Sequence, residues 1–250
     1  MMTQDKSIRR NPFHVLSSLG PVLETRDIEI AMDFSRKGAT EAMSRWMRSG
    51  YVKPFSFVIC FNVVAYPKSP QTHVFEAASR ALRRPVALIG ASALHTAGWT
   101  TQMPTGYELA IACDRNVRRW KRMEGITAEA RSTSWFAAVI PYLLRTPNGF
   151  DRLPPALALV DAIASEEKFA LLSPDDRREH HKNGTVTWHP HADDISLPLD
   201  REPEEIWREI VEAAEILEVP YETVRDYALG IPELSDIIDA TSAALPRPGY

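Results

Sequence analysis

The chain has 250 residues, of which 44% are hydrophobic and 25% are charged, and its formal net charge is −4. These values are ordinary for a globular protein with one large domain or two modest ones. No run approaches the roughly 18 apolar residues of a membrane span, and the N-terminus lacks the apolar segment of a signal peptide, so we expect a cytoplasmic protein with no membrane contact. Cys60 and Cys113 give neither a disulfide framework nor zinc spacing, and we expect two buried thiols.

Charge is distributed unevenly along the chain. Residues 1–70 contain 10 Lys and Arg against 6 Asp and Glu, and residues 71–160 contain 11 against 6. Residues 161–250 contain 8 against 21. The first 160 residues can therefore attract a polyanion, while the acidic end repels one.

Two short helices are expected near the N-terminus. Asn11 is a good N-cap with Pro12 at the first helical position, and Gly20 closes this first helix. After an extended segment at 21–23, Thr25 is expected to cap a second helix. Its buried face would consist of Ile28, Ala31 and Met32.

A third helix is expected to follow a turn at residues 33–38 and to run to about residue 48. Its apolar side chains recur at helical spacing: Ala39, Ala42, Met43, Trp46 and Met47. The opposite face carries mainly cations and hydroxyls: Lys37, Thr40, Glu41, Ser44, Arg45 and Arg48. Such a set suits phosphates and base edges in a major groove, which makes this the candidate recognition helix.

Residues 51–65 are expected to form a two-stranded wing, with Lys53 and Ser56 near backbone phosphates. Residues 1–67 then make a winged helix-turn-helix module whose partner is double-stranded DNA. The predicted DNA contacts are Arg36, Lys37, Thr40, Ser44, Arg45, Arg48 and Lys53. The alternative is an ordinary three-helix bundle with a solvated polar face.

A polar, proline-containing connector at residues 67–70 predicts a domain boundary. Residues 71–165 are expected to form a central α/β domain. Its elements would be a helix at 72–82, a buried strand at 86–89, a helix of small residues at 90–99 and a strand at 107–113.

Residues 12–165 resemble the AbiEi antitoxins of the AbiE abortive-infection system, which is grouped with type IV toxin–antitoxin systems. The resemblance rests on three sets of residues. They are the winged-helix layout with Ala42, Met43, Trp46, Gly50 and Tyr51, the segment with Ser92, Ala93, Leu94, His95, Gly98, Gln102 and Pro104, and residues 153–161. The chain differs from the family pattern in its apolar wing and in its acidic residues 166–250.

The resemblance implies a transcriptional autorepressor in phage defence, whose N-terminal domain binds operator repeats ahead of its own operon. The second domain would counter a nucleotidyltransferase-like toxin encoded beside it, without a stable toxin–antitoxin complex. A related regulator without a toxin gene is the alternative within this interpretation.

A dense basic cluster follows the strand at 107–113 and consists of Arg115, Arg118, Arg119, Lys121 and Arg122, with Trp120 between them. It can serve as a second phosphate-contacting patch, with Trp120 available for stacking. It can equally be a solvated loop or helix face.

Residues 166–250 are expected to form an acidic, mainly helical region that packs on the central domain. Amphipathic helices are predicted at 202–218 and 220–230. Four nearby histidines, His180, His181, His189 and His191, suggest a metal, but their spacing and the intervening turn residues favour no metal site. The acidic surface is either solvated or binds a basic partner.

The sequence contains no Gly-rich phosphate loop, nucleophile elbow or ordered triad, so we expect no enzyme, no cofactor and no metal. The predicted fold is α+β: a winged helix-turn-helix, a mixed α/β domain and an acidic helical end. The predicted function is that of a sequence-specific DNA-binding autorepressor and antitoxin. The alternatives are a non-catalytic interaction protein and a stand-alone regulator.

Overall fold

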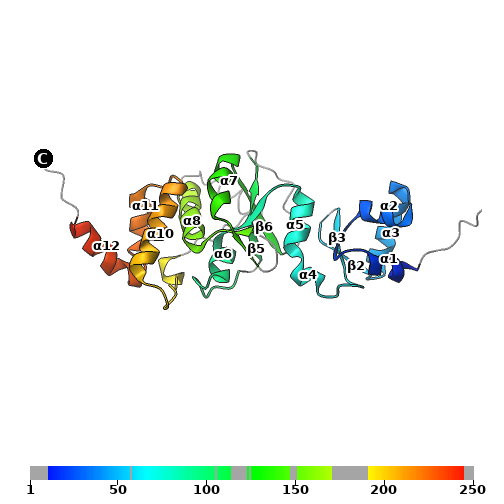
Figure 1. Cartoon of the computed structure of the whole chain (residues 1–250), viewed down its shortest axis with the longest axis horizontal. Coiled ribbons are helices and arrows are strands. Elements are labelled where there is room, and N and C mark those ends of the chain that lie inside the picture. Colours follow the sequence, from blue (N-terminus) through cyan, green and yellow to red (C-terminus); the bar gives the residue numbers. More distant parts are fainter. Residues whose placement is uncertain are drawn as a thin grey trace, which may run out of the picture. The chain divides into compact units, whose positions relative to one another are not determined.

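The computed structural model describes residues 11–56, 58–104, 106–113, 123, 125–146, 151–170 and 191–244 (Figure 1). Helices and sheets both occur, so the α+β class is confirmed. The chain divides into two compact units. The first holds the described residues up to Arg84 together with Met123, and the second holds the rest.

The first unit combines helices with one small sheet. Its elements in chain order are α1 (Pro12–Ser18), β1 (Val22–Glu24), α2 (Thr25–Met32), α3 (Arg36–Arg48), β2 (Val52–Pro54), β3 (Ile59–Asn62), α4 (Ser69–Thr72) and α5 (Val74–Leu82). The sheet is antiparallel with strand order β1–β3–β2. The extended segment predicted before α2 is thus a third strand, added to the expected hairpin.

Local side-chain hydrogen bonds fix the starts of the helices. The Phe13 amide donates to Asn11 Oδ1 at 3.0 Å, as the cap prediction requires. The N-cap of α2 is Glu24 rather than Thr25, because the Glu24 amide donates to Asp27 Oδ2 at 2.7 Å in a capping box. Helix α3 begins at Arg36, before the expected turn ends, because Ser35 Oγ accepts from the Gly38 amide at 3.3 Å.

Helices α2 and α3 pack against each other across a short turn at residues 33–35. Asp33 makes the turn with φ 54°, in the left-handed region where Asp is among the better tolerated residues. Ile28 of α2 and Ala39 of α3 are fully buried in this contact region. The rest of the buried cluster is Val15, Leu16, Leu23, Ala42, Met43, Trp46, Val52 and Cys60.

The first unit extends past the predicted connector at 67–70. Helices α4 and α5 both pack on β3. Arg80 of α5 donates from Nη1 to the Val22 carbonyl at 3.0 Å and pairs with Glu76 at 2.8 Å. These contacts join α5 to the small sheet, so the unit continues to Arg84.

Asn62, at the end of β3, is completely buried and links three parts of the first unit. Its Nδ2 donates to the carbonyls of Leu16 at 2.8 Å and Gly20 at 3.2 Å, and its Oδ1 accepts from the Ala65 amide at 3.3 Å. One side chain therefore links the end of α1 and the loop after it to the turn that follows β3.

The second unit is built on a mixed sheet with strand order β6–β5–β4–β8–β7. Its elements are β4 (Val86–Leu88), α6 (Gly90–Thr96), β5 (Tyr107–Ala112), β6 (Ile126–Arg131), α7 (Thr133–Val139), η2 (Ile140–Tyr142), β7 (Leu144–Arg145), β8 (Asp151–Arg152), α8 (Pro155–Ala170), η3 (Ala192–Asp194), α10 (Pro203–Ile216), α11 (Tyr221–Ala228) and α12 (Pro232–Ala244). The pairs β4–β5 and β7–β8 are antiparallel, and the pairs β4–β8 and β5–β6 are parallel.

The acidic helices of the second unit pack through apolar stripes. Ile206, Trp207 and Ile210 of α10 are buried, and α10 contacts α8, α11 and α12 (Figure 1). The helices predicted at 202–218 and 220–230 are confirmed as α10 and α11, while α12 was not predicted. Among the described residues, no helix combines the length and apolar character needed to cross a bilayer.

A buried ionic network joins β6, α7 and α8. Arg131 donates to Asp161 from Nε at 3.1 Å and from Nη2 at 2.9 Å, and its Nη1 lies 2.9 Å from Glu129 Oε2. Trp135 Nε1 donates to the same Asp161 at 2.9 Å. The two carboxylates raise the pKa of Arg131 against the opposing effect of its burial, so the guanidinium stays charged.

The substitution Asn62→Ala tests the buried amide. We expect a loss of about 3 kcal/mol in the free energy of unfolding, because the completely buried Asn62 side chain makes three hydrogen bonds that alanine cannot replace. Asn11→Ala removes an exposed helix cap and should cost about 1 kcal/mol. Urea unfolding followed by circular dichroism measures both free energies. Equal losses in the two variants would contradict a special role of the buried Asn62 amide.

The substitution Asp161→Asn tests the ionic network. Leaving Arg131 with only part of its charge compensation should lower the free energy of unfolding by about 3 kcal/mol. The matched control is Asp151→Asn, which removes an exposed carboxylate 3.9 Å from Arg145 and should cost under about 1 kcal/mol. The interpretation fails if the two variants unfold at the same urea concentration.

Candidate nucleic-acid interface

Helix α3 carries six of the seven residues predicted to contact DNA. Arg36, Lys37, Thr40, Arg45 and Arg48 are exposed, and Ser44 is half-buried. Ala39, Ala42, Met43 and Trp46 occupy the buried face, so the predicted division of the helix into two faces is confirmed. The seventh residue, Lys53, lies exposed on β2.

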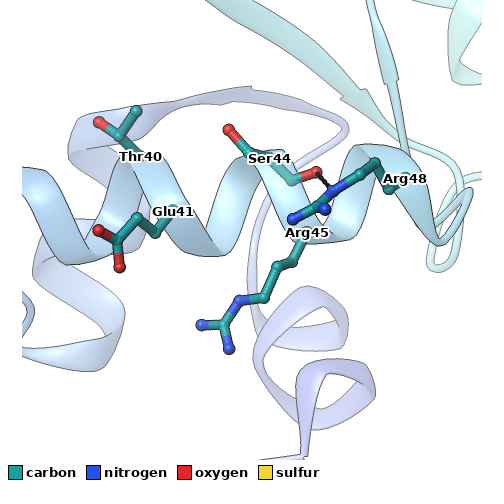
Figure 2. A pocket seen from close by; sticks show the side chains of 5 residues that line it. All are labelled: Thr40, Glu41, Ser44, Arg45 and Arg48. Carbon is teal, nitrogen blue, oxygen red and sulfur yellow. Dashed lines mark hydrogen bonds between the residues drawn. The ribbon is translucent and has the colours of Figure 1, made fainter.

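Part of this face forms a shallow hollow of about 390 Å3. Its lining residues are Thr40, Glu41, Ser44, Arg45 and Arg48. Figure 2 shows that the Glu41 and Arg45 side chains leave the helix on one side, while Thr40 and Ser44 lie on the other. The hollow thus offers cations, hydroxyls and one carboxylate next to one another.

Few of these polar groups are used within the protein. Arg48 Nε donates to the Ser44 carbonyl at 3.4 Å, and Thr40 Oγ1 donates to the Arg36 carbonyl at 2.8 Å. Within the described part of the chain, no hydrogen bond or ion pair engages the side chains of Arg36, Lys37 and Arg45. Three cations on one helix are therefore available to an anionic partner.

A second hollow, of about 1100 Å3, lies on the same unit and shares Thr40 and Ser44 with the first. Its lining joins α2, α3, the β2–β3 loop and Arg83: Glu24, Thr25, Arg26, Glu29, Arg36, Thr40, Met43, Ser44, Met47, Ser56, Val58 and Arg83. Arg26 and Arg83 are not among the site residues predicted from the sequence. Arg26 follows the start of α2 and is exposed. Only the apolar face of this helix was assigned from the sequence, so Arg26 was not considered.

The β2–β3 hairpin keeps most of its apolar residues inside. Phe55 and Phe61 are each 3% exposed and pack edge to face, with ring centroids 5.3 Å apart. Val58 at the loop is 50% exposed. Most apolar residues of this segment therefore belong to the core, while Lys53 is exposed and Ser56 is half-buried.

Other residues singled out from the sequence lie outside the described residues or in the second unit. The basic cluster Arg115, Arg118, Arg119, Lys121 and Arg122 lies outside the described residues, as do His180, His181 and His189. His191 is exposed and precedes η3. The described residues contain no group of three or more His, Cys, Asp or Glu that could hold a metal ion.

No protein-family model matches the chain, and no curated protein matches it significantly.

Cys60 lies on β3, in the sheet that supports α3, and is buried as predicted, as is Cys113 of the second unit. Burial raises the pKa of the Cys60 thiol from 9.0 to about 11. The raised pKa in the folded state means that ionisation favours unfolding. The contribution of this thiol to stability is complete below pH 9 and declines as the pH rises from 9 towards 11.

We predict that iodoacetamide leaves Cys60 unmodified in the folded protein at pH 8. The thiolate is the reacting form, and its population at this pH is roughly one in a thousand at the raised pKa. Peptide mass spectrometry after a timed reaction measures the label, with the protein in urea as the control. Equal labelling with and without urea would show that β3 opens readily.

Proposed function

We propose that the chain is a sequence-specific, double-stranded-DNA-binding transcriptional autorepressor whose first unit is a winged helix-turn-helix. The observation that carries the proposal is the outward face of α3, where Arg36, Lys37 and Arg45 have no partner within the described residues. Cations of this kind contact phosphates, and arginine also pairs with guanine in the major groove.

The arrangement around α3 supports the same function. Helices α2 and α3 are joined by a turn at residues 33–35, the length typical of a helix-turn-helix. In that motif the second helix enters the major groove. The β2–β3 hairpin follows α3 directly, where it would serve as the wing and bring Lys53 and Ser56 to the DNA backbone.

The proposal includes the antitoxin role that the resemblance to AbiEi proteins implies. In that role the second unit counters a nucleotidyltransferase-like toxin encoded beside the gene, without a stable complex. Genes of such a pair lie in one operon, so repression by the first unit would control both. The test of this part is rescue of growth when the chain is co-expressed with the product of the neighbouring gene.

Binding to the DNA directly upstream of the gene tests the first part. The full chain should prefer this duplex to a scrambled one, and Arg45→Ala combined with Arg48→Ala should weaken binding roughly 30-fold or more. The slope of log affinity against log salt should fall by about 0.9 for each of the two arginines that contacts a phosphate. Fluorescence anisotropy across a salt series measures both quantities.

The matched control removes two arginines from the second unit, Arg145→Ala with Arg208→Ala, and should bind like the unmodified chain. A chain that binds the upstream and scrambled duplexes equally at low salt is not a specific repressor. If both double substitutions weaken DNA binding equally, α3 is not the DNA-binding element.

A further inference from the structure

Glu41 is the one carboxylate among the residues that line the smaller hollow on α3, beside Arg45 and Arg48. It is exposed, and within the described residues its carboxylate forms no hydrogen bond or ion pair. Arg45 stands four residues later, the spacing at which Glu76 and Arg80 form an ion pair on α5, yet within the described residues Glu41 and Arg45 are not paired. Helix pairing therefore does not explain this carboxylate.

A carboxylate on a DNA-binding face has restricted uses. It repels phosphates, so it weakens binding wherever it faces the backbone. It accepts hydrogen bonds and donates none when ionised. Glu41 therefore fits DNA only where the opposing group is a hydrogen-bond donor on a base edge.

In the major groove, only one base presents a hydrogen-bond donor without an acceptor beside it. Cytosine presents its N4 amino group, whereas guanine presents acceptors and thymine presents an acceptor and a methyl group. Adenine presents its N6 amino group next to the N7 acceptor, which repels a carboxylate. The chemistry of the groove thus ranks cytosine first for Glu41.

We infer that Glu41 accepts a hydrogen bond from the N4 amino group of a cytosine and is a base-reading residue of α3. The inference rests on the proposed DNA-binding function and adds the base that this face selects. Arg45 lies about 6 Å further along the helix axis, so it faces a neighbouring base pair or phosphate and does not compete for the same cytosine.

Selection from a library of randomised duplexes tests the inference with the full chain. Glu41→Gln is the informative variant, because glutamine keeps the length of the side chain and pairs with adenine N6 and N7. Glu212→Gln on α10 is the matched control, since it changes the net charge equally in the second unit. Both glutamates are exposed, so both variants should fold. Thermal unfolding verifies this.

The unmodified chain and Glu212→Gln should enrich one motif with a fixed cytosine, and Glu41→Gln should replace that cytosine by adenine and keep the other positions. In direct binding, each of the two proteins should prefer its own duplex by about tenfold or more. A gain in affinity that is equal for every sequence would show only the loss of a negative charge and would overturn the inference.

The two proposals fail in different ways. If the unmodified chain and Glu41→Gln enrich the same motif, DNA recognition stands and base reading by Glu41 is wrong. If the unmodified chain enriches no motif, sequence-specific DNA binding is wrong and the inference falls with it.

Discussion

The buried amide of Asn62 is the contact on which the arrangement of the first unit depends. It holds the end of α1 and the following loop through the Leu16 and Gly20 carbonyls, from a strand 46 residues further along the chain. Strand β3, which ends at Asn62, pairs with both β1 and β2. Because α2 follows β1 directly and β2 follows α3, this small sheet anchors both ends of the helical pair.

The arginines on α3 differ from several other arginines of the fold, which are paired with carboxylates, as Arg80 of the first unit is with Glu76. In the second unit, Arg131 is held by Asp161 and Glu129, and Arg201 lies 2.6 Å from Glu209. On α3, Arg36 and Arg45 have no such partner within the described residues. Cations that the fold does not use are the ones free to bind a polyanion, which gives the uneven charge of the sequence a structural basis.

The sequence predicted much of this arrangement because local signals determine it. Asn11 and Pro12 marked the start of α1, and helical spacing assigned Ala39, Ala42 and Trp46 to the core and the cations to the surface. The binding function of that surface is still a prediction.

The contacts that could not be predicted from the sequence join residues far apart in the chain. The Asn62 amide and the contact from Arg80 to Val22 join residues 42 to 58 positions apart, so neither leaves a local pattern. Arg26 was overlooked for a related reason: it joins Arg36 and Ser56 in one hollow only after α2, α3 and the hairpin have packed.

Photo-crosslinking determines whether α3 is the element in contact with DNA. A photoreactive amino acid replaces Thr40 on α3 in one full-length variant and Tyr221 on α11 in another, and each is irradiated with the upstream duplex. If α3 lies in the major groove, position 40 crosslinks to bases and position 221 does not. Crosslinks from position 221 alone, or from neither position under conditions where the duplex is bound, would contradict this placement of α3.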